Sequence, residues 1–141
     1  MRFLDRFQPL ALLVLRLVIG AVMIAHGYPK VFGGLQHHVH MVSNLGLPGW
    51  LAYVSAFAEF GGGILLVIGF CTRCAALAVL IDISVAIWKV HWRNGFTGQG
   101  GYEFTLSLAA IAFALIFFGA GPISLDAIRG GGRATIKKSI R

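Results

Sequence analysis

Four long apolar stretches dominate the pattern of hydrophobic and polar positions along the chain. They run roughly over residues 9–27, 51–70, 74–92 and 103–120. Each has about the 20 residues that a helix needs to cross the hydrocarbon core of a bilayer. None alternates between apolar and polar positions, as the strand of a membrane barrel would, and a backbone inside lipid must pair within its own segment. We therefore expect an all-α protein, an integral membrane four-helix bundle that forms a single domain over residues 1–141.

The longest connection between these stretches covers residues 28–50 and has its own periodicity. One face carries apolar residues and another carries polar residues at helical spacing, respectively Leu35, Val39 and Val42, and His37, His40 and Asn44. This pattern predicts a short amphipathic helix that lies in the membrane interface.

The composition supports a membrane protein and argues against several soluble classes. Hydrophobic residues make up 57% of the chain and charged residues 12%, whereas a soluble domain carries about 25% charged residues. The mean hydropathy is +0.81. A nuclear factor, a cytosolic enzyme and a small secreted disulfide protein are therefore poor candidates.

The net charge of +7 resembles that of a nucleic-acid-binding protein, but its distribution indicates membrane topology instead. With four spans, both termini and the turn near residue 72 share one side, which holds eight basic residues: Arg2, Arg6, Arg73, Arg129, Arg133, Lys137, Lys138 and Arg141. The opposite side holds three: Lys30, Lys89 and Arg93. The positive-inside rule then predicts cytoplasmic termini in a bacterial inner (plasma) membrane, with the basic tail over residues 127–141 on anionic lipid headgroups. No nucleic-acid partner is expected.

Three ionisable residues interrupt the apolar stretches near the middle of the bilayer. Arg16, Glu59 and Asp82 come from three different spans and are expected at about the same depth. Charged groups facing lipid are costly, so they should meet inside the bundle, with Arg16 pairing with Glu59 or Asp82. Such a group predicts either a proton or ligand site, with the carboxylates as catalytic residues, or a buried ion network that only fixes helix register.

A second polar group is expected above this level, at the external ends of the spans. It comprises His26, Lys30, His91, Tyr102 and Glu103, around an opening lined by Tyr28, Trp88 and Trp92. Imidazole, ammonium, phenol and carboxylate groups suit a ligand with carbonyl or hydroxyl oxygens, and a quinone head fits, with Glu103 taking a proton. The alternative is that each side chain only reaches toward the interface.

Two motifs point weakly to other chemistry. His37 and His40 are spaced to chelate a metal on one helical face, but no further ligands are evident nearby, so no metal is predicted. Cys71 and Cys74 form a CxxC pair at the start of a span, as in thioredoxin-like sites, yet the cytoplasm keeps thiols reduced. We interpret the pair as small residues at a tight turn.

Taken together, the sequence resembles the DoxX family of small four-helix membrane proteins. The matching stretches are LRLVIGAVMIAHGYPKVFGG (15–34), AEFGGGILLVIGFCTR (58–73), HWRNGF (91–96), GYEFTLSLAAIAFAL (101–115) and FGAGPISLD (118–126). By this resemblance, the following residues occupy family motif positions: Arg16, His26, Lys30, Glu59, Glu103 and Asp126. The family is named for a subunit of a thiosulfate:quinone oxidoreductase, and its members are described as redox-associated companions of other proteins.

These observations lead to one functional hypothesis and two alternatives. The hypothesis is a quinone-linked subunit of a larger oxidoreductase system, in contact with membrane lipids and compatible with a homo-oligomer. It would bind its ligand through Arg16, His26, Lys30, His91 and Tyr102. The alternatives are a non-catalytic accessory subunit of a membrane complex and a small transporter or lipid-binding protein.

Overall fold

A computed structural model describes residues 2–130, and every regular element in that part of the chain is helical. The helices are η1 (Arg2–Phe7), α1 (Gln8–Phe32), α2 (Leu35–Asn44), α3 (Leu51–Ile68), α4 (Thr72–Ala86), η2 (Ile87–His91), η3 (Trp92–Asn94) and α5 (Glu103–Phe118). Residues 125–130 are also helical, and residues 131–141 of the expected basic tail lie outside the described part. The all-α prediction is thus confirmed for residues 2–130.

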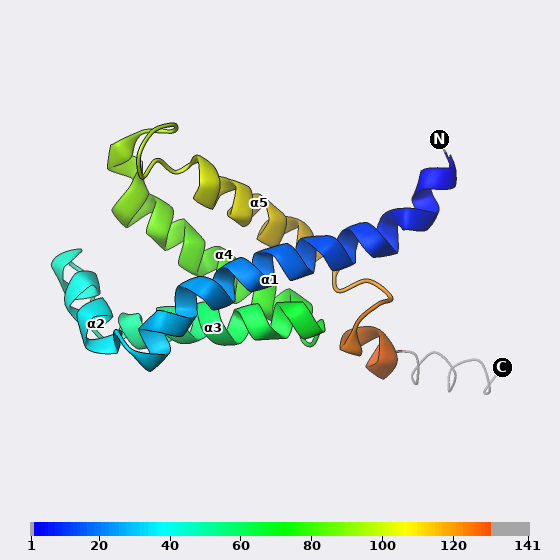
Figure 1. The fold of residues 1–141 in the computed structure, drawn as a ribbon, viewed down its shortest axis with the longest axis horizontal. Coiled ribbons are helices and arrows are strands. Elements are labelled where there is room, and N and C mark those ends of the chain that lie inside the picture. Colours follow the sequence, from blue (N-terminus) through cyan, green and yellow to red (C-terminus); the bar gives the residue numbers. More distant parts are fainter. Residues whose placement is uncertain (1, 131–141) are drawn as a thin grey trace.

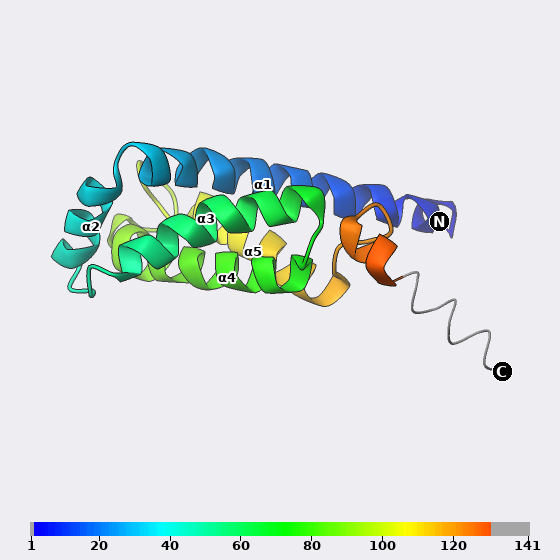
Figure 2. The same ribbon diagram turned by 90° about the horizontal axis from the view of Figure 1, so that it is seen from below.

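The molecule is elongated and has two different ends (Figure 1). At one end, which we call the α2 end, lie α2 and the loop between α4 and α5. At the other, which we call the turn end, lie η1, the turn between α3 and α4, and residues 119–130 (Figure 2). The described part of the chain therefore begins and ends at the same end of the molecule.

Three helical stretches are long and apolar enough to cross a membrane: Leu4–Phe32, Leu51–Ile68 and Thr72–Asn94. The first is longer than expected, because α1 continues through Pro29 to Phe32 instead of ending near residue 27. The helix α5 has 16 residues, and it is apolar but shorter than the other three. The predicted helix in the long connection is confirmed as α2.

One hydrophobic core joins α1, α3, α4 and α5. Its buried residues are Ile19 and Met23 from α1, Leu66 from α3, Ala75, Ala76, Val79 and Ile83 from α4, and Leu108, Ala109, Ala112 and Leu115 from α5. Many of these side chains are small, which allows close approach of helices in lipid, where the hydrophobic drive for association is weak.

Glycines set the register of α1 against α3. A Cβ atom at Gly27 would lie 2.5 Å from the backbone nitrogen of Phe60, and one at Gly63 would lie 2.9 Å from the carbonyl oxygen of Gly20. Only glycine allows these backbones to approach so closely. The two antiparallel helices are therefore aligned by contacts that fix which residues of α1 lie beside which residues of α3.

We expect Gly63→Ala to destabilise the protein by about 1–3 kcal/mol, because the new methyl group would overlap the backbone of α1. Gly61→Ala is a matched control, since a Cβ atom there has no neighbour within 4 Å. Alanine favours a helix over glycine by about 1 kcal/mol, so the control should be neutral or stabilising. Thermal unfolding of the two purified variants checks this. Equal melting temperatures would mean that the α1–α3 contact is looser than described.

Candidate functional site

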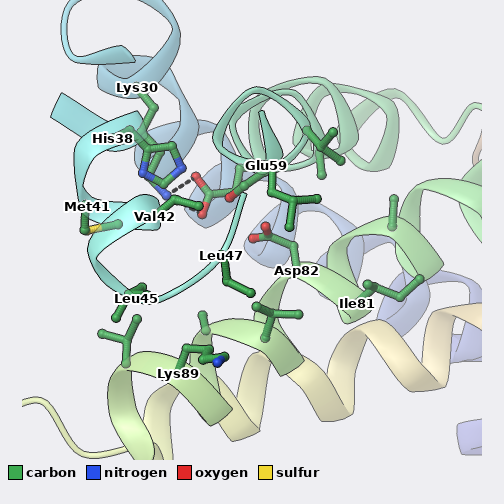
Figure 3. A pocket seen from close by; sticks show the side chains of 18 residues that line it. Lys30, His38, Met41, Val42, Leu45, Leu47, Glu59, Ile81, Asp82 and Lys89 are labelled. Carbon is green, nitrogen blue, oxygen red and sulfur yellow. Dashed lines mark hydrogen bonds and ion pairs between the residues drawn. The ribbon is translucent and has the colours of Figure 1, made fainter. Parts of the chain in front are cut away.

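A cavity of about 340 Å³ lies between α3 and α4 at the α2 end (Figure 3). The helix α2 and the segment that follows it cover one side of the cavity with Met41, Val42, Leu45 and Leu47. The lining is mainly aliphatic, and its polar side chains are Lys30, His38, Ser55, Glu59, Asp82 and Lys89. A largely apolar cavity with a few polar groups has the character of a small-molecule binding site.

An ion pair between α1 and α3 forms the polar wall of this cavity. The Nζ atom of Lys30 lies 2.6 Å from both carboxylate oxygens of Glu59, and it donates a hydrogen bond to Oε1. The side chain of Glu59 is 10% exposed and that of Lys30 is 25% exposed. The register set by Gly27 explains the pair, because it places the last turns of α1 beside the middle of α3.

A second carboxylate reaches the same space from α4. Asp82 is partly buried, and its carboxylate points into the cavity toward Glu59 (Figure 3). Two carboxylates near one ammonium group leave an excess acid at this wall, which is a common arrangement for a group that gives or takes a proton. The sequence prediction that Glu59 and Asp82 lie close together inside the bundle agrees with this geometry.

His38 is a cavity residue that the sequence reasoning did not select. It is 5% exposed, and its Nε2 atom is buried and has no hydrogen-bond partner in the described part of the chain. Burial lowers the pKa of this imidazole, and the positive charge of Lys30 lowers it further. The signal was present in the sequence, because position 38 is three residues after Leu35 and four before Val42, on the apolar face of the predicted helix.

The remaining wall is apolar and open on its outer side. Val54 of α3 and Ile81 of α4 line the cavity and are 52% and 58% exposed, respectively. Exposed aliphatic side chains on membrane-spanning helices face lipid tails, so the cavity opens laterally toward the bilayer.

The end of α4 shapes the part of the cavity nearest the α2 end. Here the helix continues as a π-helical turn, η2, which contributes Lys89 and Val90 to the lining. A π-helical turn shifts the following side chains around the helix axis and is frequently found at functional sites. The Nζ atom of Lys89 lies 4.3 Å from the ring centre of Trp88, so the ammonium group has an aromatic neighbour.

Arg16 does not join this group, and the prediction that it pairs with Glu59 or Asp82 is wrong. Its Nη1 atom donates a hydrogen bond of 2.5 Å to the carbonyl oxygen of Ala120, and its guanidinium group lies beside Gly69. Gly69 follows Glu59 by ten residues, or about 15 Å along a helix. The sequence prediction placed Arg16 and Glu59 at the same depth by counting residues from the expected limits of each span. This estimate was wrong because α1 extends beyond residue 27 and its glycine contacts fix a different alignment with α3.

The second predicted group is also divided by the structure. Of its members only Lys30 lines the cavity, together with Asp82 and Glu59 from the mid-depth group. His26 is exposed on α1 and its Nδ1 atom lies 2.9 Å from the carbonyl oxygen of Val22 in its own helix. The expectation of one opening formed by all five residues is therefore wrong, since α1 and the start of α5 present their polar ends separately.

The other three predicted residues lie where the connection between α4 and α5 begins and ends. The Nδ1 atom of His91 lies 2.8 Å from the carbonyl oxygen of Gly100, and Tyr102 stacks on Trp92 with ring centres 5.3 Å apart. Glu103 is exposed in the first turn of α5. These contacts order the loop, and none of the three residues lines the cavity.

The CxxC pair lies at the turn end, and neither cysteine lines the cavity. Cys71 and Cys74 are free thiols and both are exposed. The carboxylate of Asp126 accepts hydrogen bonds from the backbone nitrogens of Cys71 and Thr72, at 2.8 and 2.9 Å. Burial raises the pKa of Asp126, but these two backbone donors, together with the nearby positive charge of Arg129, outweigh it and the pKa is lowered. Asp126 therefore anchors residues 119–130 to the start of α4.

No three side chains of His, Cys, Asp or Glu within residues 2–130 lie close enough to share a metal ion. The polar side chains that line the cavity can donate and accept hydrogen bonds. A buried imidazole, two ammonium groups and two carboxylates supply both donors and acceptors.

Comparisons with known proteins relate the chain to a family and to several membrane proteins. Residues 11–92 match the profile of the family described as DoxX. The chain is 32% identical to "Putative oxidoreductase CatD" of Bacillus subtilis over 73% of this chain and 76% of that protein. It is 29% identical to "Inner membrane protein YphA" of Escherichia coli over 84% of this chain and 90% of that protein. It is 30% identical to "Inner membrane protein YqjF" of the same organism, over 87% and 95%. No solved structure matches the chain.

The predicted location in the bacterial inner membrane is confirmed by two independent observations. Two relatives that span most of the chain are named as inner membrane proteins. Three helical stretches of the structure have the length and hydropathy of membrane spans.

Proposed function

Because the chain belongs to the DoxX family, we propose that its cavity binds the head of a membrane quinone and that the protein serves a larger oxidoreductase system as a subunit. One observation carries this proposal. Acid and base groups, Lys30, Glu59 and Asp82, stand at the wall of an apolar cavity that opens toward lipid. A lipophilic molecule with a proton-accepting head matches that combination.

The residues of the cavity fit such a ring. The buried Nε2 atom of His38 has no partner among residues 2–130, so it is available to bond with an oxygen of a ligand. The carboxylate of Asp82 takes no part in the ion pair between Lys30 and Glu59. It can therefore hold or release a proton next to the quinone ring. The aliphatic residues exclude water from between these groups, which strengthens their electrostatic interactions.

When bound, a quinone supplies the two-electron, two-proton chemistry, and this chain orients its head and exchanges protons with it. The electrons would come from a partner protein in the same system. The name of the Bacillus subtilis relative, an oxidoreductase, supports a redox context.

We also propose that α5 forms the fourth span and that both ends of the chain face the cytoplasm. The helix has 16 residues, about 24 Å in length, and contributes Leu108, Ala112 and Leu115 to the common core. The excess of basic residues near the termini supports the orientation.

We expect Asp82→Asn to weaken the binding of decylubiquinone roughly tenfold or more, because a hydrogen bond to a charged group contributes about 1.5–3 kcal/mol. The replacement has the same shape but cannot exchange a proton. Titration of decylubiquinone into the purified protein, followed by quenching of tryptophan fluorescence, measures the affinity.

Two control variants accompany this measurement. Ser84→Ala changes an exposed residue of the same helix whose hydroxyl group bonds to Leu80 of its own helix. Cys71→Ser changes the turn end of the molecule. Both should bind as the wild type does. Equal affinity of wild type and Asp82→Asn would remove Asp82 from the site, and phospholipid but no quinone in the purified protein would favour a lipid-binding function.

A further inference from the structure

The cavity contains one buried polar group that takes no part in the ion pair or in the proposed proton exchange, the imidazole of His38. Its Nε2 atom is enclosed by protein and has no hydrogen-bond partner within the described residues. Burying a polar atom without a partner destabilises a protein, and such atoms are rare in native structures. The unsatisfied nitrogen therefore indicates a bond that forms with something outside the chain.

The helix α2 places this imidazole at the cavity. Its buried residues are His38 and Val42, and both line the cavity, whereas His37 and His40 are exposed on the opposite side. Figure 3 shows the ring of His38 beside Lys30 and the carboxylate of Glu59. Thus one of the three neighbouring histidines is turned inward, to the place where the polar groups of the cavity meet.

We propose that His38 anchors the head of the ligand and that the site selects molecules with a single polar head and a long apolar tail. This inference rests on the proposed function, that the cavity binds a membrane quinone. The head oxygen bonds to Nε2 of His38 beneath α2, and the tail leaves between α3 and α4 into the lipid.

The charge of the surroundings favours a neutral imidazole in this role. Lys30 faces His38 from α1, and Glu59 and Asp82 face the cavity from α3 and α4, with Lys89 at its end and His37 next to it in the chain. Burial lowers the pKa of His38, as do the charges of Lys30 and His37, while Glu59 opposes them. A neutral imidazole can donate to a carbonyl oxygen or accept from a hydroxyl group, so it suits both redox forms of a quinone head.

The aliphatic lining of the cavity supports the proposal that the ligand has an apolar tail. Lys30, His38 and Glu59 lie together at the polar side of the cavity (Figure 3), and its lining residues Val54 and Ile81 are also exposed on the outer surface. A small hydrophilic molecule would leave this apolar part uncovered. An amphiphile buries it, with its tail among the lipid chains that already surround α3 and α4.

The test compares decylubiquinone with ubiquinone-0, which has the same head and no tail. His38→Phe should weaken the binding of both probes about five- to tenfold, and His38→Gln, which restores a donor, should recover part of the loss. The matched control His40→Phe changes the exposed side of α2 and should bind as the wild type does. Ile81→Trp, which fills the lateral opening, should weaken decylubiquinone but not ubiquinone-0.

Unfolding of the ligand-free protein separates this role from a structural one. An anchoring His38 has no bond to lose at Nε2, so His38→Phe should be as stable as the wild type or more stable. The wild type should also lose stability as the pH falls below about 6.5, because the unfolded imidazole, with its ordinary pKa, binds a proton more readily than the folded one. His38→Phe should lack this part of the pH dependence.

The outcomes distinguish the two proposals. If decylubiquinone binds the wild type and His38→Phe equally, the anchoring role is overturned while the quinone site remains. If His38→Phe unfolds at a much lower temperature than His40→Phe, His38 is structural and the anchoring role is overturned again. If neither probe binds the wild type at all, the proposed function fails, and this inference fails with it.

Discussion

Arg16→Leu is expected to lower the free energy of unfolding by about 2–3 kcal/mol, although Arg16 lies far from the cavity. The side chain is 1% exposed, and its guanidinium group donates to the carbonyl oxygen of Ala120 just after α5. Leucine would leave that carbonyl group without this donor and would remove one of the two positive charges, Arg16 and Arg129, that act on the carboxylate of Asp126. A lost hydrogen bond from a charged donor accounts for the magnitude. Thermal or denaturant unfolding in detergent micelles measures it.

A double variant tests the position of Arg16. If Arg16 paired with Glu59, Arg16→Leu combined with Glu59→Gln would recover much of the lost stability, because no unpaired charge would remain. In the structure Arg16 lies beside Gly69, which is about 15 Å from Glu59 along α3. We therefore expect the effects of the two substitutions on stability to add. Recovery in the double variant would contradict the register of α1 against α3.

Lys30→Met is expected to destabilise the protein by about 2–4 kcal/mol. The substitution leaves the carboxylate of Glu59, which is 10% exposed, without its counter-ion and beside a second acid, Asp82. Breaking a buried pair from one side costs about 3–5 kcal/mol, and the partial exposure of Lys30 reduces this value. Lys30→Met with Glu59→Gln should recover much of the loss, and a double-mutant cycle gives the coupling energy.

Lys89→Met serves as the control for the ion pair. Lys89 lines the same cavity, but its ammonium group lies over the ring of Trp88 and makes no ion pair with a carboxylate of residues 2–130. We expect its replacement to cost less than about 1 kcal/mol, the usual value of an exposed cation–π contact. If both lysine variants unfold at the same temperature, the bond between Lys30 and Glu59 contributes little to stability.

The elements of this protein could be predicted from its sequence because local rules govern them. An apolar segment in lipid must satisfy its own backbone, so residues 51–68 had to be helical whatever they packed against. The helical spacing of Leu35, Val39 and Val42 likewise predicted α2 and its apolar face.

What the sequence alone determined is therefore the helices, their membrane character and the presence of acids deep within them. What only the tertiary structure decided is which charged groups meet. That choice depends on the offset between α1 and α3, which the contacts of Gly27 and Gly63 fix and which span limits do not reveal. The offset brings Lys30, not Arg16, to Glu59, and it sends Arg16 to the carbonyl group of Ala120. The position of His38 also depends on the tertiary structure. A histidine on the apolar face of α2 lines a cavity only because α3 and α4 leave a space next to that face.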